Sequence, residues 1–191
     1  MNCAYTDDFA YVGCTKTGSC AVSEWMKEAL GASTCWFFRH VPRAVWRKPV
    51  VVSVRDPYSR CVSLFVSVMK QDGDRYGFRQ AVSDGTMEGM LRFLIQQKGS
   101  KTRNIDLMLT QMEQIEIVSR TSYRIIHHES LEKGIEALPW VNTSVELPVI
   151  NRKKNRDEFD TEELLTPQVI ELIHQWCPED FKFLGYEKRT V

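Results

Sequence analysis

Short apolar runs alternate along this chain with longer stretches in which apolar residues recur every three or four positions. The short runs predict strands near residues 9–13, 34–38, 49–54 and 123–127. The longer stretches predict helices near 20–30, 57–70, 86–97 and 167–176. This order predicts an α/β fold of three layers around a central, mainly parallel sheet. In such sheets ligands bind beyond the carboxyl ends of the strands, so the residues that follow each strand are the first candidates for function.

The first of these strands runs into a short polar loop and then into an amphipathic helix. The loop holds Lys16, Thr17 and Gly18, and Ser19 follows them. Free N–H groups at a helix start, the helix dipole and a lysine together favour a bound phosphate or sulfate group. The spacing of Gly13 and Gly18 is that of a nucleotide-binding phosphate loop, but Ser19 stands where that loop has its lysine. A kinase or ATPase is therefore disfavoured but stays open, as does an ordinary strand-to-helix turn.

A second strand end carries another candidate anion site. The apolar run that ends at Val54 is followed by Arg55, with Asp56 as a natural N-cap and Pro57 at the first helical position. At about 3.6 residues per turn, Ser63 comes round some two turns into this helix. The Arg55 guanidinium and the Ser63 hydroxyl can then converge on one phosphate.

In their order and combination, these motifs resemble those of the sulfotransferases that use 3′-phosphoadenosine-5′-phosphosulfate (PAPS), in particular the carbohydrate-type domains. The resemblance implies that Lys16, Thr17, Gly18, Ser19 and Cys20 bind the 5′-phosphosulfate. It implies that Arg55 and Ser63 bind the 3′-phosphate. The stretches 123–131, 165–173 and 179–186 are similar to later parts of the same domains. The resemblance implies a P-loop-like sulfotransferase fold in a single domain over residues 1–191.

The activity implied by the resemblance is transfer of a sulfuryl group from PAPS to a hydroxyl, in preference to an amine, by in-line displacement. Adenosine 3′,5′-bisphosphate (PAP) is the implied product, and Lys16 is the implied electrophilic helper. For the base, His40 is the first choice because it follows the second predicted strand and histidine titrates near neutrality. A capping or surface role for His40 stays open, and Glu24 or Glu28 is the alternative base.

Other polar segments have less defined roles. The basic run 151–156 resembles the segment that closes over the nucleotide in this family, through Lys153 or Lys154, although a charge run is also typical of solvated surface. Neighbouring strand residues point to opposite faces, so His127 and His128 are not expected to share one metal ion or proton. They are interpreted as structural, and contact of one of them with the acceptor stays open. The polar region 70–122 is either a lid over the acceptor pocket or a helical excursion, and within it Gln111 matches the family.

Composition narrows the class of protein further. The chain has 191 residues, 43% of them hydrophobic, which suits one domain with a substantial core. Its 25 basic and 25 acidic residues balance, so neither nucleic acid nor an anionic membrane is an expected partner. No apolar run approaches the roughly 20 residues that cross a bilayer, and a cytoplasmic location is expected. The six cysteines lack zinc or C-x-x-C spacing and are expected as reduced thiols.

Three assignments compete on this basis. A sulfotransferase would bind PAPS without a metal ion, in agreement with the lack of an acidic cluster beside the loop, and would act on a small-molecule or saccharide acceptor. A small nucleotide kinase would need ATP and magnesium. A non-catalytic nucleotide-binding module would bind PAP and transfer nothing. The sequence identifies neither the acceptor nor the oligomeric state.

Overall fold

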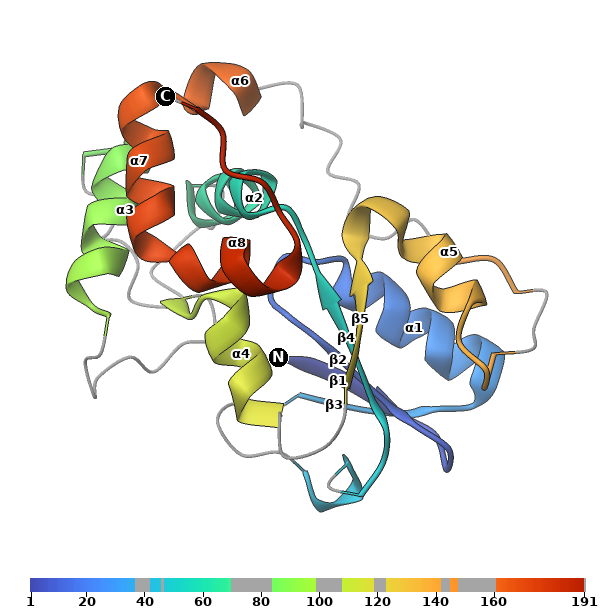
Figure 1. Ribbon diagram of the computed structural model, residues 1–191. Coiled ribbons are helices and arrows are strands. Elements are labelled where there is room, and N and C mark those ends of the chain that lie inside the picture. The colour runs from blue at the N-terminus through green and yellow to red at the C-terminus, as the bar shows by residue number, and fades with distance from the viewer. Residues whose placement is uncertain are drawn as a thin grey trace. The chain divides into compact units, whose positions relative to one another are not determined.

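Figure 1 shows the computed structural model, which describes residues 1–36, 42–45, 47–69, 84–98, 108–118, 123–141, 145–147 and 161–190. The chain divides into two compact units. The first comprises Met1–Arg55 and Gln111–Lys153, and the second comprises Asp56–Thr110 and Lys154–Val191. The length of the chain predicts that both units belong to one domain, and this stays a prediction.

The first unit is built on a five-stranded sheet with the strand order β3-β1-β2-β4-β5. The strands are β1 (Asn2–Tyr5), β2 (Ala10–Gly13), β3 (Ser33–Trp36), β4 (Val50–Val54) and β5 (Tyr123–His127). Strands β2, β4 and β5 pair in parallel, whereas β1 is antiparallel to both of its neighbours. Four strands therefore run in one direction and β1 runs against them. The predicted α/β class with a mainly parallel sheet is confirmed.

Helices cover both faces of this sheet, as Figure 1 shows, with α1 (Ser19–Leu30) and α5 (Leu131–Glu136) on one side and α4 (Gln111–Val118) on the other. Tyr11, Val51 and Ile126 belong to the core beneath α1 and α5. Strand β4 is buried along its whole length, as expected of a central parallel strand. The short 3₁₀ turns η1 (Arg43–Val45) and η3 (His128–Ser130) complete the described elements of the unit.

The first helix follows the apolar pattern that predicted it, beginning one residue earlier. Its buried face carries Val22, Trp25 and Met26. Gly18 is its N-cap, with φ of 79°, and Gly31 ends it, with φ of 63°. The Trp25 indole N–H also donates to the carbonyl oxygen of Val145 at 2.7 Å. The packed face holds the helix against the sheet, and the two glycines set where it begins and ends. The candidate site depends on the position of the helix start.

The second unit is helical in its described part. Its helices are α2 (Pro57–Met69), α3 (Met87–Gln96), α6 (Thr161–Leu164), α7 (Pro167–Trp176) and α8 (Pro178–Leu184). The core includes Phe65, Leu91 and the completely buried Trp176. The predicted caps are confirmed, because an Asp56 carboxylate oxygen accepts the Ser59 N–H at 2.8 Å. Likewise, the Thr166 hydroxyl accepts the Val169 N–H at 3.3 Å.

Several elements differ from the sequence prediction. Strand β1 was not predicted, nor were the short helices α4, α5, α6 and α8. Residues 37 and 38 of the predicted second strand lie outside the described part of the chain. All six cysteines are free, as expected. Among the described residues, no helix combines the length and apolar character needed to cross a bilayer.

Candidate anion-binding site

The candidate site begins where β2 ends and α1 starts. Between them, residues 14–18 form a turn in which Lys16 has a φ of 71°. Lys16 is the one non-glycine residue of the described chain with a positive φ, a conformation that costs of order 1–3 kcal/mol. Such strain is maintained only where the surroundings impose it. The turn is thus a defined structure that holds a lysine at the amino end of a helix.

Two glycines allow the turn to pack tightly. A Cβ atom on Gly13 would overlap the Cβ of Ser19 and lie 2.8 Å from the Tyr11 hydroxyl oxygen. A Cβ on Gly18, whose φ is also positive, would lie 2.9 Å from Nδ1 of His128. The His128 ring, which follows β5, therefore lies directly against the turn. Glycine is required at both positions for steric reasons.

A chain of buried hydroxyl groups ties the turn to the sheet. The Thr17 hydroxyl donates to the carbonyl oxygen of Cys14 at 2.6 Å and lies 2.7 Å from the Ser53 hydroxyl. The Ser53 hydroxyl lies 2.6 Å from that of Tyr11. Because each hydroxyl has one proton, Ser53 must donate to Thr17 and Tyr11 must donate to Ser53. Burial raises the pKa of Tyr11, which keeps this first donor protonated.

Arg55 brings a second cation to the same edge of the sheet. It follows β4, the parallel neighbour of β2, and it is 9% exposed. Its guanidinium donates to the carbonyl oxygen of Lys16 at 3.4 Å. The side chain predicted to bind one anionic group therefore contacts the main chain of the turn predicted to bind the other.

Helix α4 holds both segments through two side-chain amides. The Gln111 amide accepts the Arg55 N–H at 2.7 Å and donates to the Arg55 carbonyl oxygen at 2.8 Å. The Gln114 amide oxygen accepts the Thr15 N–H at 2.8 Å and lies 3.3 Å from the Thr15 hydroxyl. Both glutamines are completely buried. A buried amide must find hydrogen-bond partners, and here those partners are the two candidate anion-binding segments.

The electrostatic character of the site favours an anion. The first turn of α1 contains no acidic residue. Its first residue, Ser19, is 8% exposed and its hydroxyl accepts a hydrogen bond from Asn2 at 3.3 Å. Cys20 is exposed, and its sulfur accepts from the same amide at 3.1 Å. The helix dipole, Lys16 and Arg55 all place positive charge at this edge.

The predicted site residues have different outcomes. Lys16, Gly18, Ser19, Cys20 and Arg55 lie around the start of α1 or at the adjoining strand end. Thr17 is completely buried, so its side chain has a structural role within the turn. Ser63 is partly buried on α2, in the second unit, and its convergence with Arg55 stays a prediction.

The candidates for the catalytic base and for the closing segment stay predictions. His40, Lys153 and Lys154 lie outside the described residues. Glu24 and Glu28 are exposed on α1, on the solvated side that the helical pattern predicts. The identity of the catalytic base therefore stays a prediction.

Sequence reasoning missed two residues that shape the site, Ser53 and Gln114. Ser53 lies within an apolar run and gave no signal of its own. Gln114 lies in a region without a clear pattern, although its spacing of three from Gln111 places both on one face of a helix. His128 was interpreted as structural, and its ring packs against Gly18, a contact that depends on the pairing of β5 with β4.

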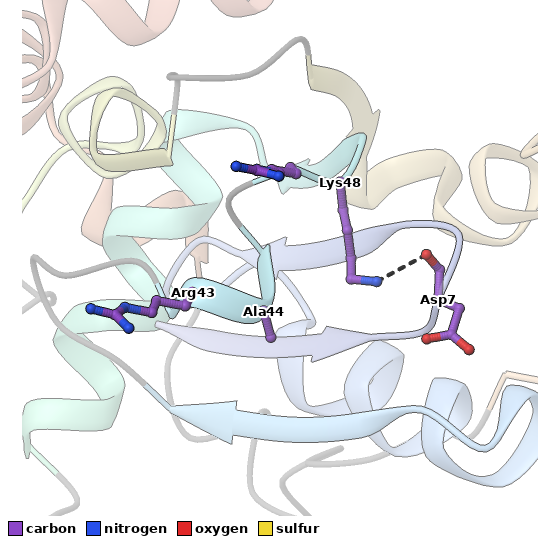
Figure 2. Close-up of a pocket in the computed structure, with 5 residues that line it drawn as sticks. Asp7, Arg43, Ala44 and Lys48 are labelled. Carbon is purple, nitrogen blue, oxygen red and sulfur yellow. Dashed lines mark hydrogen bonds between the residues drawn. The ribbon is translucent and has the colours of Figure 1, made fainter.

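A separate basic hollow of about 510 Å³ is lined by Asp7, Arg43, Ala44, Arg47 and Lys48, four of which are labelled in Figure 2. Lys48 donates from its ammonium group to the carbonyl oxygen of Asp7 at 2.9 Å. Lys48 precedes the first residue of β4, whereas Arg55 follows the last. The hollow therefore lies at the opposite end of the strand from the candidate site.

The described residues include no group of three or more histidine, cysteine or acidic side chains arranged to hold a metal ion. Comparisons of the chain with models of protein families, with curated proteins and with solved structures found no match. A functional interpretation therefore depends on the motifs and on the geometry of this site.

The hydroxyl chain leads to a prediction about stability. Replacing Ser53 with Ala leaves the buried hydroxyls of Tyr11 and Thr17 without the group that joins them, and loss of a buried partner costs about 1–3 kcal/mol. We expect Ser53→Ala to lower the free energy of unfolding by that amount in urea titrations. Ser33→Ala, at an exposed position on β3, is the control and should change the free energy of unfolding by less than about 0.5 kcal/mol. Equal effects of the two substitutions would contradict the role given to the hydroxyl chain.

Proposed function

We propose that this protein is a PAPS-dependent sulfotransferase, which moves the sulfuryl group from PAPS to an acceptor hydroxyl and releases PAP. The observation that carries the proposal is the contact between the Arg55 guanidinium and the carbonyl oxygen of Lys16. It joins two cation-bearing segments at the ends of adjacent parallel strands. PAPS carries two separated anionic groups, and each needs its own site of this kind.

In this proposal the chain binds and orients the donor. The start of α1 and the ammonium group of Lys16 bind the 5′-phosphosulfate, while Arg55 binds the 3′-phosphate. The acceptor oxygen attacks sulfur in line with the bridging oxygen, the bond between sulfur and that oxygen breaks, and a base takes the acceptor's proton. Lys16 stabilises the negative charge that develops on the departing phosphate. Such alignment and charge stabilisation supply most of the catalysis in the analogous phosphoryl transfers.

A thermal-shift comparison tests the class of protein directly, because a ligand that binds the folded state raises the melting temperature. We expect PAP without metal to stabilise the protein more than ATP with magnesium at the same concentration. The reverse order would favour the nucleotide kinase. Stabilisation by PAP without turnover of radiolabelled PAPS, over a panel of hydroxyl and amine acceptors, would favour a non-catalytic nucleotide-binding module.

Substitution of Lys16 tests its proposed role in the transition state. A contact that strengthens only as charge develops contributes to rate more than to binding. We expect Lys16→Ala to reduce turnover of radiolabelled PAPS by roughly 100-fold or more, and to weaken PAP binding by less than about tenfold. Lys27→Ala, at an exposed position on α1, should leave both turnover and PAP binding unchanged. Equal losses in turnover and in PAP binding would refute the role.

Substitution of Arg55 tests the proposed 3′-phosphate site. Isothermal titration calorimetry should show that Arg55→Ala weakens PAP by about tenfold or more and adenosine 5′-phosphate by much less, because only PAP has a 3′-phosphate. Arg92→Ala, which removes an exposed arginine on α3, is the control and should preserve the preference for PAP. An unchanged ratio of the two affinities in Arg55→Ala would count against this assignment.

A further inference from the structure

Helix α4 contributes two glutamines to the first unit that no step of the proposed reaction uses. Gln111 and Gln114 are one turn apart on the same face of the helix, and both are 0% exposed. A buried amide loses its hydrogen bonds to water and is tolerated only where the protein replaces them. What the two amides bind therefore indicates why they are buried.

Gln111 continues the sheet beyond the last residue of β4. Its amide oxygen accepts the Arg55 N–H at 2.7 Å and its amide nitrogen donates to the Arg55 carbonyl oxygen at 2.8 Å. A neighbouring strand would offer the same donor and acceptor pair. These two bonds fix the direction of the main chain at Arg55, and with it the point from which the guanidinium extends.

Gln114 anchors the turn in a similar way. Its amide oxygen accepts the Thr15 N–H at 2.8 Å, next to the strained Lys16. The Cys14 thiol also lies 3.9 Å from the carbonyl oxygen of Gln111, as a weak donor. One helical turn thus connects the two anion-binding segments through side chains of equal length.

We propose that α4 is a spacer that sets the separation of the two anion-binding points and so makes the site selective for a nucleotide with two separated phosphate groups. This inference rests on the proposed function. A ligand that binds at two points gains the binding free energy of both only if the distance between the points matches the distance between its own two phosphate groups. A ligand with one phosphate at the turn is insensitive to that separation. Gln111 and Gln114 are positioning residues, acting through Arg55 and Thr15.

The spacer predicts different binding patterns for the two glutamines. Methionine has a similar length and volume but forms none of these hydrogen bonds. We expect Gln111→Met to weaken PAP by roughly tenfold and to leave adenosine 5′-phosphate within about twofold, because the turn keeps its Gln114 anchor. Gln114→Met should weaken both nucleotides, because it releases the turn itself. Gln175→Met, at an exposed position on α7, is the matched control and should change neither.

Titration calorimetry of each variant with PAP and with adenosine 5′-phosphate, below the melting temperature of the free variant, measures these ratios on folded protein. If Gln111→Met does not fold, Gln111→Asn is the variant that tests the spacer. Asparagine keeps a buried amide but is one methylene too short to bond to both the Arg55 N–H and the Arg55 carbonyl oxygen. Loss of the preference for PAP in the Gln111 variant supports the spacer. A preserved preference, or equal weakening of both nucleotides by that variant, would overturn the spacer alone. A wild-type chain without a preference for PAP would overturn the proposed function as well.

Discussion

The parallel pairing of β2 with β4 is the constraint on which the site depends. Its register sets Gly13 opposite Ser53, so the turn after β2 and Arg55 after β4 leave the same edge of the sheet. A slip of one residue would turn Ser53 to the other face and separate it from Tyr11 and Thr17. The hydrogen bonds among these three hydroxyls therefore depend on the register and also help to specify it.

Buried polar groups surround this pairing on both faces of the sheet. On the side of α1, Ser53 of β4 bonds to Thr17 of the turn. From α4, Gln114 bonds to Thr15 of the turn and Gln111 bonds to Arg55 after β4. Each of these side chains satisfies a polar group that would otherwise be buried at a cost. The strained conformation of Lys16 is maintained within this network. The turn is thus held in shape before any ligand binds, which reduces the ordering cost of binding.

Local patterns predicted much of this arrangement. The apolar runs that gave β2 and β4 are buried in the sheet. The run that gave β5 forms the strand next to β4, with only Ile126 buried. The caps at Asp56 and Thr166 follow from side-chain chemistry within a few residues. The turn and Arg55 could be proposed as a candidate site from the sequence because motifs of this kind occupy short contiguous segments. Strand β1 was missed because its four residues carry too little periodicity. Gln114 and Ser53 were missed because their hydrogen-bond partners are distant in sequence. Gln114 binds Thr15. Ser53 binds Tyr11 and Thr17.

The central claim is that two neighbouring strand ends bind the two anionic groups of one nucleotide. A crystal structure of the protein with PAP tests it most directly. We expect the 5′-phosphate at the start of α1, within hydrogen-bond distance of Lys16 and the main-chain N–H groups of the turn, and the 3′-phosphate on the Arg55 guanidinium. A nucleotide bound with neither phosphate at these two points, for example in the basic hollow formed by Arg43, Arg47 and Lys48, would contradict the account.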